Sequence, residues 1–127
     1  MTIAEVSKKY DLTADTIRYY ERIGLIPTIP RTKNGIRDFD EESCSWIEFI
    51  KCMRNAGMKI EILLEYVNLF RQGKTTVEAR KKLLEEQREK LKEKQESINA
   101  TIERLDYKLE LYDEIILGKR KDFTETI

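Results

Sequence analysis

Apolar residues recur at helical spacing in five stretches of this 127-residue chain. A capping box formed by Thr2 and Glu5 opens the first helix, which ends near Tyr10. A tight turn leads into a second helix, which begins at the N-cap residue Thr13 and stops at Gly24. Two helices joined by so short a turn predict a helix-turn-helix.

A short hairpin is predicted after the second helix. Pro27 and Pro30 interrupt helical structure, and a turn signal at residues 33–35 separates two short extended stretches, residues 28–31 and 36–39. Attached to a helix-turn-helix, such a hairpin would form a wing. A plain surface hairpin with solvated side chains is the alternative.

The third and fourth helices complete the first half of the chain. Asp40 caps the third helix, whose inward face is predicted at Trp46, Phe49, Ile50 and Met53. The fourth helix carries two apolar rows, one at Ile60, Leu63, Leu64, Val67 and Phe70 and the other at Ile62, Tyr66 and Leu69. Two apolar faces on one short helix predict two partners, the domain's own core and a long helix of this or a second subunit.

One long helix is predicted for the second half of the chain. After a linker at residues 71–74, a second capping box at residues 75–78 opens a helical pattern that ends near Gly118. A helix of about 40 residues is ~60 Å long.

A heptad repeat runs along this helix. Apolar residues recur at every seventh position from Val77 through Leu84, Leu91, Ile98 and Leu105 to Tyr112, and Ile102, Leu109 and Ile116 widen the seam in its second half. The pattern is typical of a coiled coil that needs its partner mostly beyond Ile98. We expect the dimer interface at Leu84, Leu91, Ile98, Ile102, Leu105, Leu109 and Tyr112, rather than a solvated single helix.

These elements predict a mainly α fold with three parts. A winged helix-turn-helix domain would occupy residues 1–74 and a coiled-coil dimerisation helix residues 75–118. The tail at residues 119–127 is polar, and we expect it to be disordered or loosely docked through Phe123.

Charge is distributed unevenly although the chain is neutral, with 24 basic and 24 acidic residues. Residues 16–37 contain five basic side chains against Glu21 alone, a local excess of four positive charges. A basic patch is a footprint of polyanion binding. Arg18, Tyr19 and Arg22 share an outer face of the second helix, which suits phosphates and base edges, or else is only a solvated face.

Catalytic and metal-binding chemistry is poorly represented. With no histidine, no glycine-rich phosphate loop and no nucleophile beside an evident base, the sequence predicts neither an enzyme nor a bound cofactor. Two cysteines without histidine do not supply the usual ligands of a transition-metal site. No N-terminal apolar run resembles a signal peptide or membrane span, so we expect a cytoplasmic protein without a membrane partner.

Three motifs resemble a known family. The sequence TIRYYERIGLIP at residues 16–27, followed by Arg31 and GIRDF at residues 35–39, is similar to the signature of the MerR family of bacterial transcription regulators. FIKCMRNAGM at residues 49–58 resembles the AdhR/NmlR-type branch, which senses aldehydes and other electrophiles. The resemblance covers roughly residues 2–117.

The resemblance implies a homodimer with antiparallel long helices that binds double-stranded promoter DNA. Such dimers activate transcription by bending and untwisting an over-long promoter spacer so that RNA polymerase can engage it. The DNA-binding candidates are Thr16, Arg18, Tyr19, Arg22, Arg31, Lys33 and Arg37.

The same resemblance assigns Cys52 as the sensor of a small reactive aldehyde. Lys51 and Arg54 would favour its thiolate, whereas its place in the last turns of a helix opposes this. Cys44 falls nearly opposite the predicted inward face, and about 12 Å of helix separates the two cysteines, too far for a disulfide. A small hydrophobe at a helix flank is the plainer interpretation of Cys52.

Two other functions stay open at this stage. One is a regulator of the same family with a non-covalent effector, and the other is a coiled-coil adaptor without DNA binding.

Overall fold

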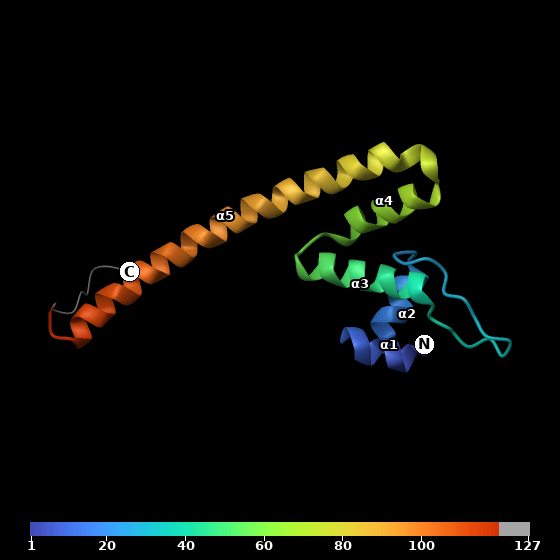
Figure 1. The fold of residues 1–127 in the computed structure, drawn as a ribbon, viewed down its shortest axis with the longest axis horizontal. Helices are drawn as coiled ribbons and strands as arrows, with labels where there is room; N and C mark the ends of the chain where they lie inside the picture. Colours follow the sequence, from blue (N-terminus) through green and yellow to red (C-terminus); the bar gives the residue numbers. More distant parts are fainter. Residues whose placement is uncertain (120–127) are drawn as a thin grey trace. The chain divides into compact units, whose positions relative to one another are not determined.

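The structure, a computed structural model, describes residues 1–119. Its helices, in chain order, are α1 (Ile3–Tyr10), α2 (Ala14–Arg22), α3 (Glu41–Asn55), α4 (Ile60–Arg71), the 3-10 helix η1 (Lys74–Thr76) and α5 (Val77–Ile116) (Figure 1). The predicted mainly α fold with a long last helix is confirmed. Residues 120–127, and with them Phe123, lie outside the described part.

The chain forms two compact units. Met1–Gln87 contain α1 to α4, η1 and the first turns of α5, and the second unit starts at Arg88 and contains the rest of α5. Within the described residues, no helix combines the length and the apolar character that a membrane span requires.

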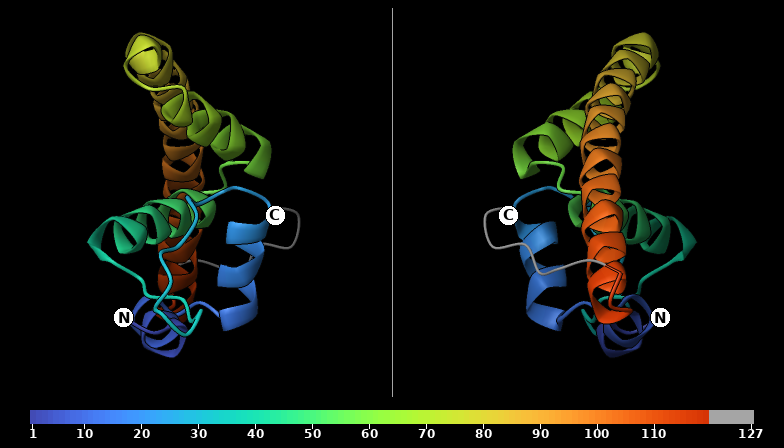
Figure 2. Two further views of the ribbon diagram at one scale, coloured as in Figure 1. Left: turned by 90° about the vertical axis from the view of Figure 1, so that its right-hand side faces the viewer. Right: turned by 90° about the vertical axis from the view of Figure 1, so that its left-hand side faces the viewer.

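Local capping determines where α1 and α2 begin and end. Glu5 N–H donates to the Thr2 hydroxyl and Thr2 N–H to the Glu5 carboxylate, which is the expected capping box. Asp11, in the left-handed conformation at φ 52°, ends α1 by donating its N–H to the Ser7 carbonyl. The chain thereby turns sharply, and α1 and α2 cross at a steep angle (Figure 2).

The hairpin after α2 is short. Within the described residues its only ladder pairing is one antiparallel bridge between Arg31 and Arg37. Thr32 N–H donates to the Ile36 carbonyl at 2.7 Å, and Gly35 N–H to the Thr32 carbonyl at 2.9 Å. Gly35 has φ 78°, which favours glycine at this turn. The predicted hairpin is therefore present as a tight loop.

The core of the first unit lies where α1 to α4 meet. Its most deeply buried side chains are Val6, Ile17, Leu25, Ile26, Ile29, Phe39, Ile47, Ile50, Leu63 and Val67. The buried face of α3 differs from the predicted one. It also includes Ile47, which is fully buried, whereas the predicted members Phe49 and Met53 are only half-buried. This face is wide because α3 packs against α1 as well as against α4.

The second apolar row of α4 packs within the same unit. The Tyr66 ring lies 5.5 Å from the Phe49 ring and 6.1 Å from the Trp46 ring, centroid to centroid. In the predicted inner row Leu63 and Val67 are buried, but Phe70 remains 37% exposed. An aromatic cluster thus joins α3 to α4.

The start of α5 differs from the prediction. A capping box was expected at residues 75–78, but the 3-10 turn of η1 instead directs Thr76 inward, where it is 7% exposed. Its hydroxyl lies within hydrogen-bonding distance of the Leu69 and Gly73 carbonyls. These carbonyls already accept from Gln72 N–H and Thr76 N–H, and the buried threonine hydroxyl is a further donor beside them.

Candidate nucleic-acid interface

The helix α2 is anchored by its inner face. The Thr13 hydroxyl caps it by accepting from Thr16 N–H at 3.1 Å, and it shares a second hydrogen bond with the Thr16 hydroxyl at 2.7 Å. Ile17 and Tyr20 are buried in the core. With this face fixed, the opposite face of α2 is directed to solvent.

The exposed face of α2 carries the three side chains that helical spacing placed together, Arg18, Tyr19 and Arg22. The Arg18 guanidinium donates to the Asp15 carboxylate at 3.0 Å. The Arg22 guanidinium lies 5.3 Å from the centroid of the Tyr19 ring, a cation–π contact. Both arginines are therefore held by neighbours one turn away.

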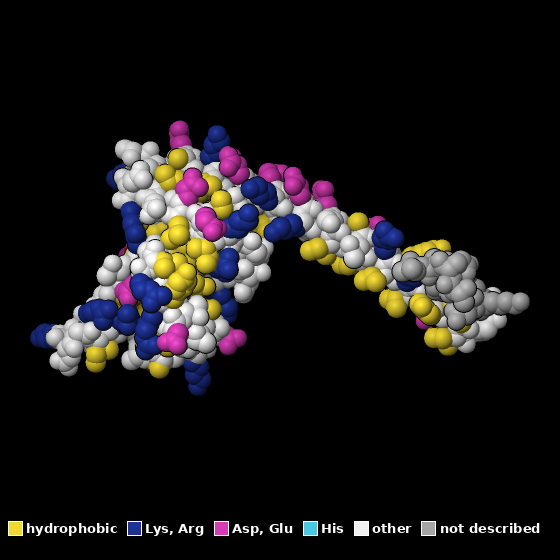
Figure 3. All heavy atoms as spheres, turned by 180° about the vertical axis from the view of Figure 1, so that it is seen from behind, with side chains coloured by type: hydrophobic (Ala, Val, Ile, Leu, Met, Phe, Trp, Pro, Cys, Tyr) yellow, Lys and Arg dark blue, Asp and Glu magenta, His cyan; other side chains and the backbone are white. Residues whose placement is uncertain are grey.

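The hairpin adds a second set of basic side chains. Arg31 donates to the Gly35 carbonyl at 2.9 Å across the turn, and Lys33 is exposed. Figure 3 shows Lys and Arg side chains gathered along this projecting hairpin.

Glu21 connects the hairpin to α2. One carboxylate oxygen accepts from Ile29 N–H at 2.8 Å, and the other accepts from Arg37 Nε at 2.8 Å. An Arg31 nitrogen lies 3.9 Å from that second oxygen. The Glu21 side chain is only 13% exposed. One half-buried carboxylate thus holds both strands of the hairpin against the end of α2.

This role of Glu21 changes the meaning of the local charge. In the net charge of residues 16–37, Glu21 counts only as one negative charge against five positive ones. In the structure it positions two of the five basic residues, Arg31 and Arg37. Its inward position one turn after Ile17 was the available signal, since an acid on a buried face requires partners.

Opposing effects determine the pKa of Glu21. Burial raises this pKa, but the hydrogen bonds from Ile29 N–H and Arg37 and the charges of Arg37 and Arg31 lower it more. The net pKa lies below its ordinary value of 4.5. The carboxylate is therefore ionised at neutral pH, as its two arginine contacts require.

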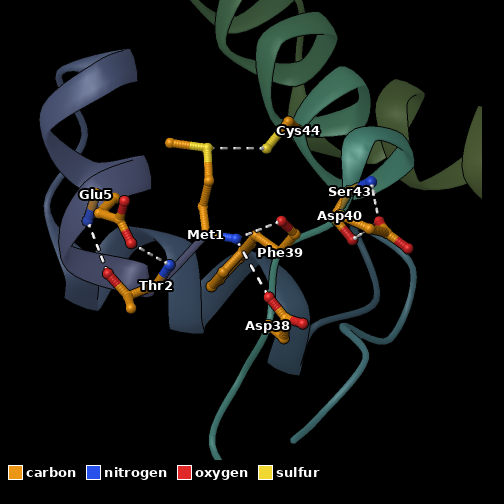
Figure 4. A network of polar contacts seen from close by, with 8 residues as sticks. All are labelled: Met1, Thr2, Glu5, Asp38, Phe39, Asp40, Ser43 and Cys44. Carbon is orange, nitrogen blue, oxygen red and sulfur yellow. Dashed lines mark hydrogen bonds and ion pairs between the residues drawn. The ribbon is translucent and has the colours of Figure 1, made fainter.

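The position predicted for Cys44 is wrong. This residue is 8% exposed and part of the core, and its sulfur lies 4.0 Å from the Met1 sulfur (Figure 4). The segment at Met1 covers it, because Phe39 N–H donates to the Met1 carbonyl at 2.8 Å. The Asp40 carboxylate caps α3 beside it by accepting from Ser43 N–H at 2.8 Å. The wide buried face of α3 includes this position.

Cys52 is exposed, so the two cysteines differ sharply in access to solvent. Its basic neighbours have other partners. Lys51 donates to the Tyr10 carbonyl, and Arg54 donates to the Met58 carbonyl at 2.8 Å. Lys51 and Arg54, which the sequence offered as basic neighbours of Cys52, thus direct these hydrogen bonds to backbone carbonyls.

Among residues 1–119, no three or more Cys, Asp or Glu side chains come together in a way that could hold a metal ion.

Two family models match the sequence of this chain. Residues 1–69 match the model of MerR HTH family regulatory proteins, and residues 45–107 match that of the MerR DNA-binding region. The chain belongs to the MerR family. The first match covers α1 to most of α4, including the exposed arginines of α2 and the hairpin.

Individual relatives agree with this assignment. This MerR-family chain is 61% identical over 88 residues to the HTH-type transcriptional regulator AdhR of Bacillus subtilis, a match covering 69% of this chain and 63% of AdhR. A MerR-family regulator structure from Listeria monocytogenes superposes with TM-score 0.88 and 47% identity, covering 93% of this chain and 89% of that one. The structure of HiNmlR, a MerR family regulator lacking the sensor domain and bound to promoter DNA, gives TM-score 0.83 at 28% identity, covering 91% and 92%.

Proposed function

We propose that this chain is a dimeric transcription activator that binds a near-palindromic promoter operator and responds to thiol-reactive aldehydes through Cys52. The observation that carries DNA binding is the exposed face of α2, where Arg18, Tyr19 and Arg22 stand free of the core while Ile17 and Tyr20 fix the helix. Such a helix enters a major groove and reads base edges with arginine.

The hairpin extends the same interface. Arg31, Lys33 and Arg37 would contact the phosphate backbone beside the groove, which adds affinity without sequence preference. Arg37 uses Nε–H for Glu21. Its guanidinium keeps about four further N–H donors for a phosphate. Support for a DNA partner also comes from the relative HiNmlR, whose structure contains promoter DNA.

The second half of α5 supports a dimer. Its seam residues Ile98, Ile102, Leu105, Leu109, Tyr112 and Ile116 are each between 48% and 80% exposed in the single chain. Figure 3 shows apolar side chains in a row along this part of the helix. A row of this kind is stable in water when a second helix covers it. Leu84 and Leu91, by contrast, are already half-buried.

The test of DNA binding begins with selection from a randomised duplex library, followed by gel shifts of the selected operator at several salt concentrations. We expect a two-fold symmetric site and affinity that falls steeply with salt, because a dimer neutralises several phosphates. A coiled-coil adaptor would select no sequence at all. In vitro transcription with RNA polymerase then tests activation at a promoter containing the site.

Access to solvent favours Cys52 over Cys44 as the reactive thiol. The Cys52 sulfur would add to the carbonyl carbon of the aldehyde, and the thiol proton would end on the former carbonyl oxygen, giving a hemithioacetal without net oxidation or reduction. Exposure is a requirement for such an addition, and buried Cys44 lacks it.

A groove in the aromatic cluster favours a second candidate, a regulator with a non-covalent effector. A groove of about 290 Å³ is lined by Glu42, Ser45, Trp46, Phe49 and Tyr66. An apolar effector bound there would contact α3 and α4 without any thiol chemistry. Induction that persists in Cys52→Ser would favour this candidate over the covalent one.

A further inference from the structure

Three residues at the joint between α4 and α5 have no role in the proposed DNA contacts, yet they are densely hydrogen-bonded. The Gly73 carbonyl accepts from Thr76 N–H at 3.1 Å, and it lies 2.9 Å from the Thr76 hydroxyl and 3.3 Å from an Arg80 nitrogen. Arg80 Nε–H also donates to the Thr76 hydroxyl at 3.1 Å. We propose that Gly73, Thr76 and Arg80 form a rigid joint that sets the direction in which the first turns of α5 leave α4 and so determines which operator spacing the dimer accepts.

The joint combines three kinds of constraint. Gly73 has φ 88°, a conformation that other residues adopt only with strain. Thr76 is buried, so its hydroxyl requires the carbonyl partners it has. The planar Arg80 guanidinium bonds Thr76 and Gly73 with two different nitrogens, which fixes its orientation. Together they leave the first turn of α5 little freedom.

Further contacts connect the joint to the DNA-binding part of the same unit. The Arg80 guanidinium lies 5.2 Å from the Phe70 ring centroid, and the Phe70 ring meets the Trp46 ring of α3 edge-on at 4.9 Å. At the end of α4, Arg71 donates to the Ile26 carbonyl at 3.4 Å, in the segment that follows α2. The direction in which α5 starts is thereby tied to α3 and to the end of α2.

The consequence for specificity rests on the proposed function. In a dimer joined through α5, each DNA-binding unit is attached to the start of that helix. A change in the direction of this start therefore moves and rotates α2 in each subunit. One inserted base pair rotates a half-site by about 35° around the duplex axis. A stiff joint makes such a mismatch unfavourable, whereas a loose joint accommodates it. Thr76 and Arg80 therefore act as positioning residues for spacing, without touching DNA.

The first measurement does not require DNA. Nitroxide spin labels are attached to Glu65→Cys on α4 and Glu86→Cys on α5, both at exposed positions, in a Cys52→Ala background. Pulsed electron paramagnetic resonance then measures the distance between the two labels. Dilution with unlabelled chain restricts the signal to distances within one subunit. We expect one narrow distribution, broadened by Thr76→Val and by Arg80→Ala. Thr75→Val and Lys82→Ala, at neighbouring exposed positions, are the matched controls and should leave it narrow.

The second measurement compares affinities for operators whose half-sites are moved apart or together by single base pairs. In Thr76→Val and Arg80→Ala, the preference for the best spacing over its neighbours should fall by about three- to tenfold, the factor expected from losing one hydrogen bond. Arg80→Lys, which keeps the charge but not the two-nitrogen contact, should show a smaller fall and remains informative if Arg80→Ala folds poorly.

The outcomes separate the joint from the proposed function. Unchanged distance distributions in both joint variants would overturn the proposal, and so would broadened distributions with an unchanged spacing preference. Equal loss of affinity at every spacing would indicate a merely structural role and would also overturn it. Absence of operator binding by the unmodified chain would refute the proposed function, and the proposal for spacing would then fall with it even where the label distances show a stiff joint.

Discussion

The Glu21 carboxylate accepts a hydrogen bond from Arg37 Nε at 2.8 Å, across sixteen residues of sequence. This contact joins the last turn of α2 to the second extended stretch of the hairpin. Since Ile29 N–H donates to the other carboxylate oxygen at 2.8 Å, Glu21 fixes the hairpin at two points. Two of the basic side chains proposed to contact DNA, Arg31 and Arg37, are thus positioned by an acid.

Replacing Glu21 with Gln should destabilise the first unit. An amide offers one acceptor oxygen where two donors, Ile29 N–H and Arg37, need partners, so one of them is left unpaired in a half-buried site. We expect the free energy of unfolding to fall by about 1–3 kcal/mol, measured by urea denaturation. Glu48→Gln, at an exposed position of α3, is the matched control and should change little. Equal free energies of unfolding for the two variants would show that the contacts of Glu21 with Ile29 and Arg37 do not stabilise the fold.

The Glu21 contribution should depend on pH in a defined direction. Its pKa is lowered in the folded chain relative to the ordinary value of 4.5, so its stabilisation is complete above about that pH. It is lost as pH falls through the folded-state pKa, where the carboxylate takes up a proton. The difference in unfolding free energy between the unmodified chain and Glu21→Gln should therefore shrink on acidification below 4.5. A difference that stays constant or grows on acidification would contradict this assignment.

Local signals explain what the sequence predicted well. Helix caps such as Thr13 and Asp40 act within three residues, and both form the expected bonds. Contacts between distant residues were missed, because nothing in a local pattern links Glu21 to Arg37 or Phe39 to Met1. The burial of Cys44 was predicted wrongly for the same reason. Helical spacing gives the middle of the buried face of α3, but the width of that face depends on how many other segments pack against the helix.

Arginine substitutions should separate backbone contacts from base readout. Arg37→Ala should weaken binding to all DNA sequences and reduce the slope of log affinity against log salt by about 0.9, one phosphate contact. Arg18→Ala, on the exposed face of α2, should in addition reduce discrimination between operator and random DNA. Gel shifts across a salt series measure both effects. An unchanged slope for Arg37→Ala would count against the hairpin as a DNA contact.

Truncation after Gln95 should yield a monomer. The shortened chain keeps all of the compact unit Met1–Gln87 but loses the exposed apolar row that begins at Ile98. We expect helical circular dichroism, a monomeric sedimentation coefficient and much weaker operator binding, because one half-site has fewer contacts than two. A full-length chain that sediments as a monomer at micromolar concentration would exclude the paired-helix arrangement.

Aldehyde treatment should modify Cys52 before Cys44. Cys52 is exposed near the end of α3, whereas Cys44 is 8% exposed beneath Met1 and becomes accessible only when that segment moves. An α,β-unsaturated aldehyde is the probe, because conjugate addition bonds the sulfur to its β-carbon, moves the thiol proton to its α-carbon and leaves a stable thioether; mass spectrometry should therefore show earlier labelling at Cys52. An adduct there adds volume one residue before Met53, which is half-buried and packs against the core. Overpacking of about 1–3 kcal/mol shifts a balanced two-state equilibrium roughly tenfold or more.

Cys52→Ser should then bind the operator normally but lose induced transcription, while Cys44→Ala should stay inducible. Induction lost only in Cys44→Ala would assign the sensor to the buried thiol, and induction kept in both variants would leave the non-covalent effector as the explanation.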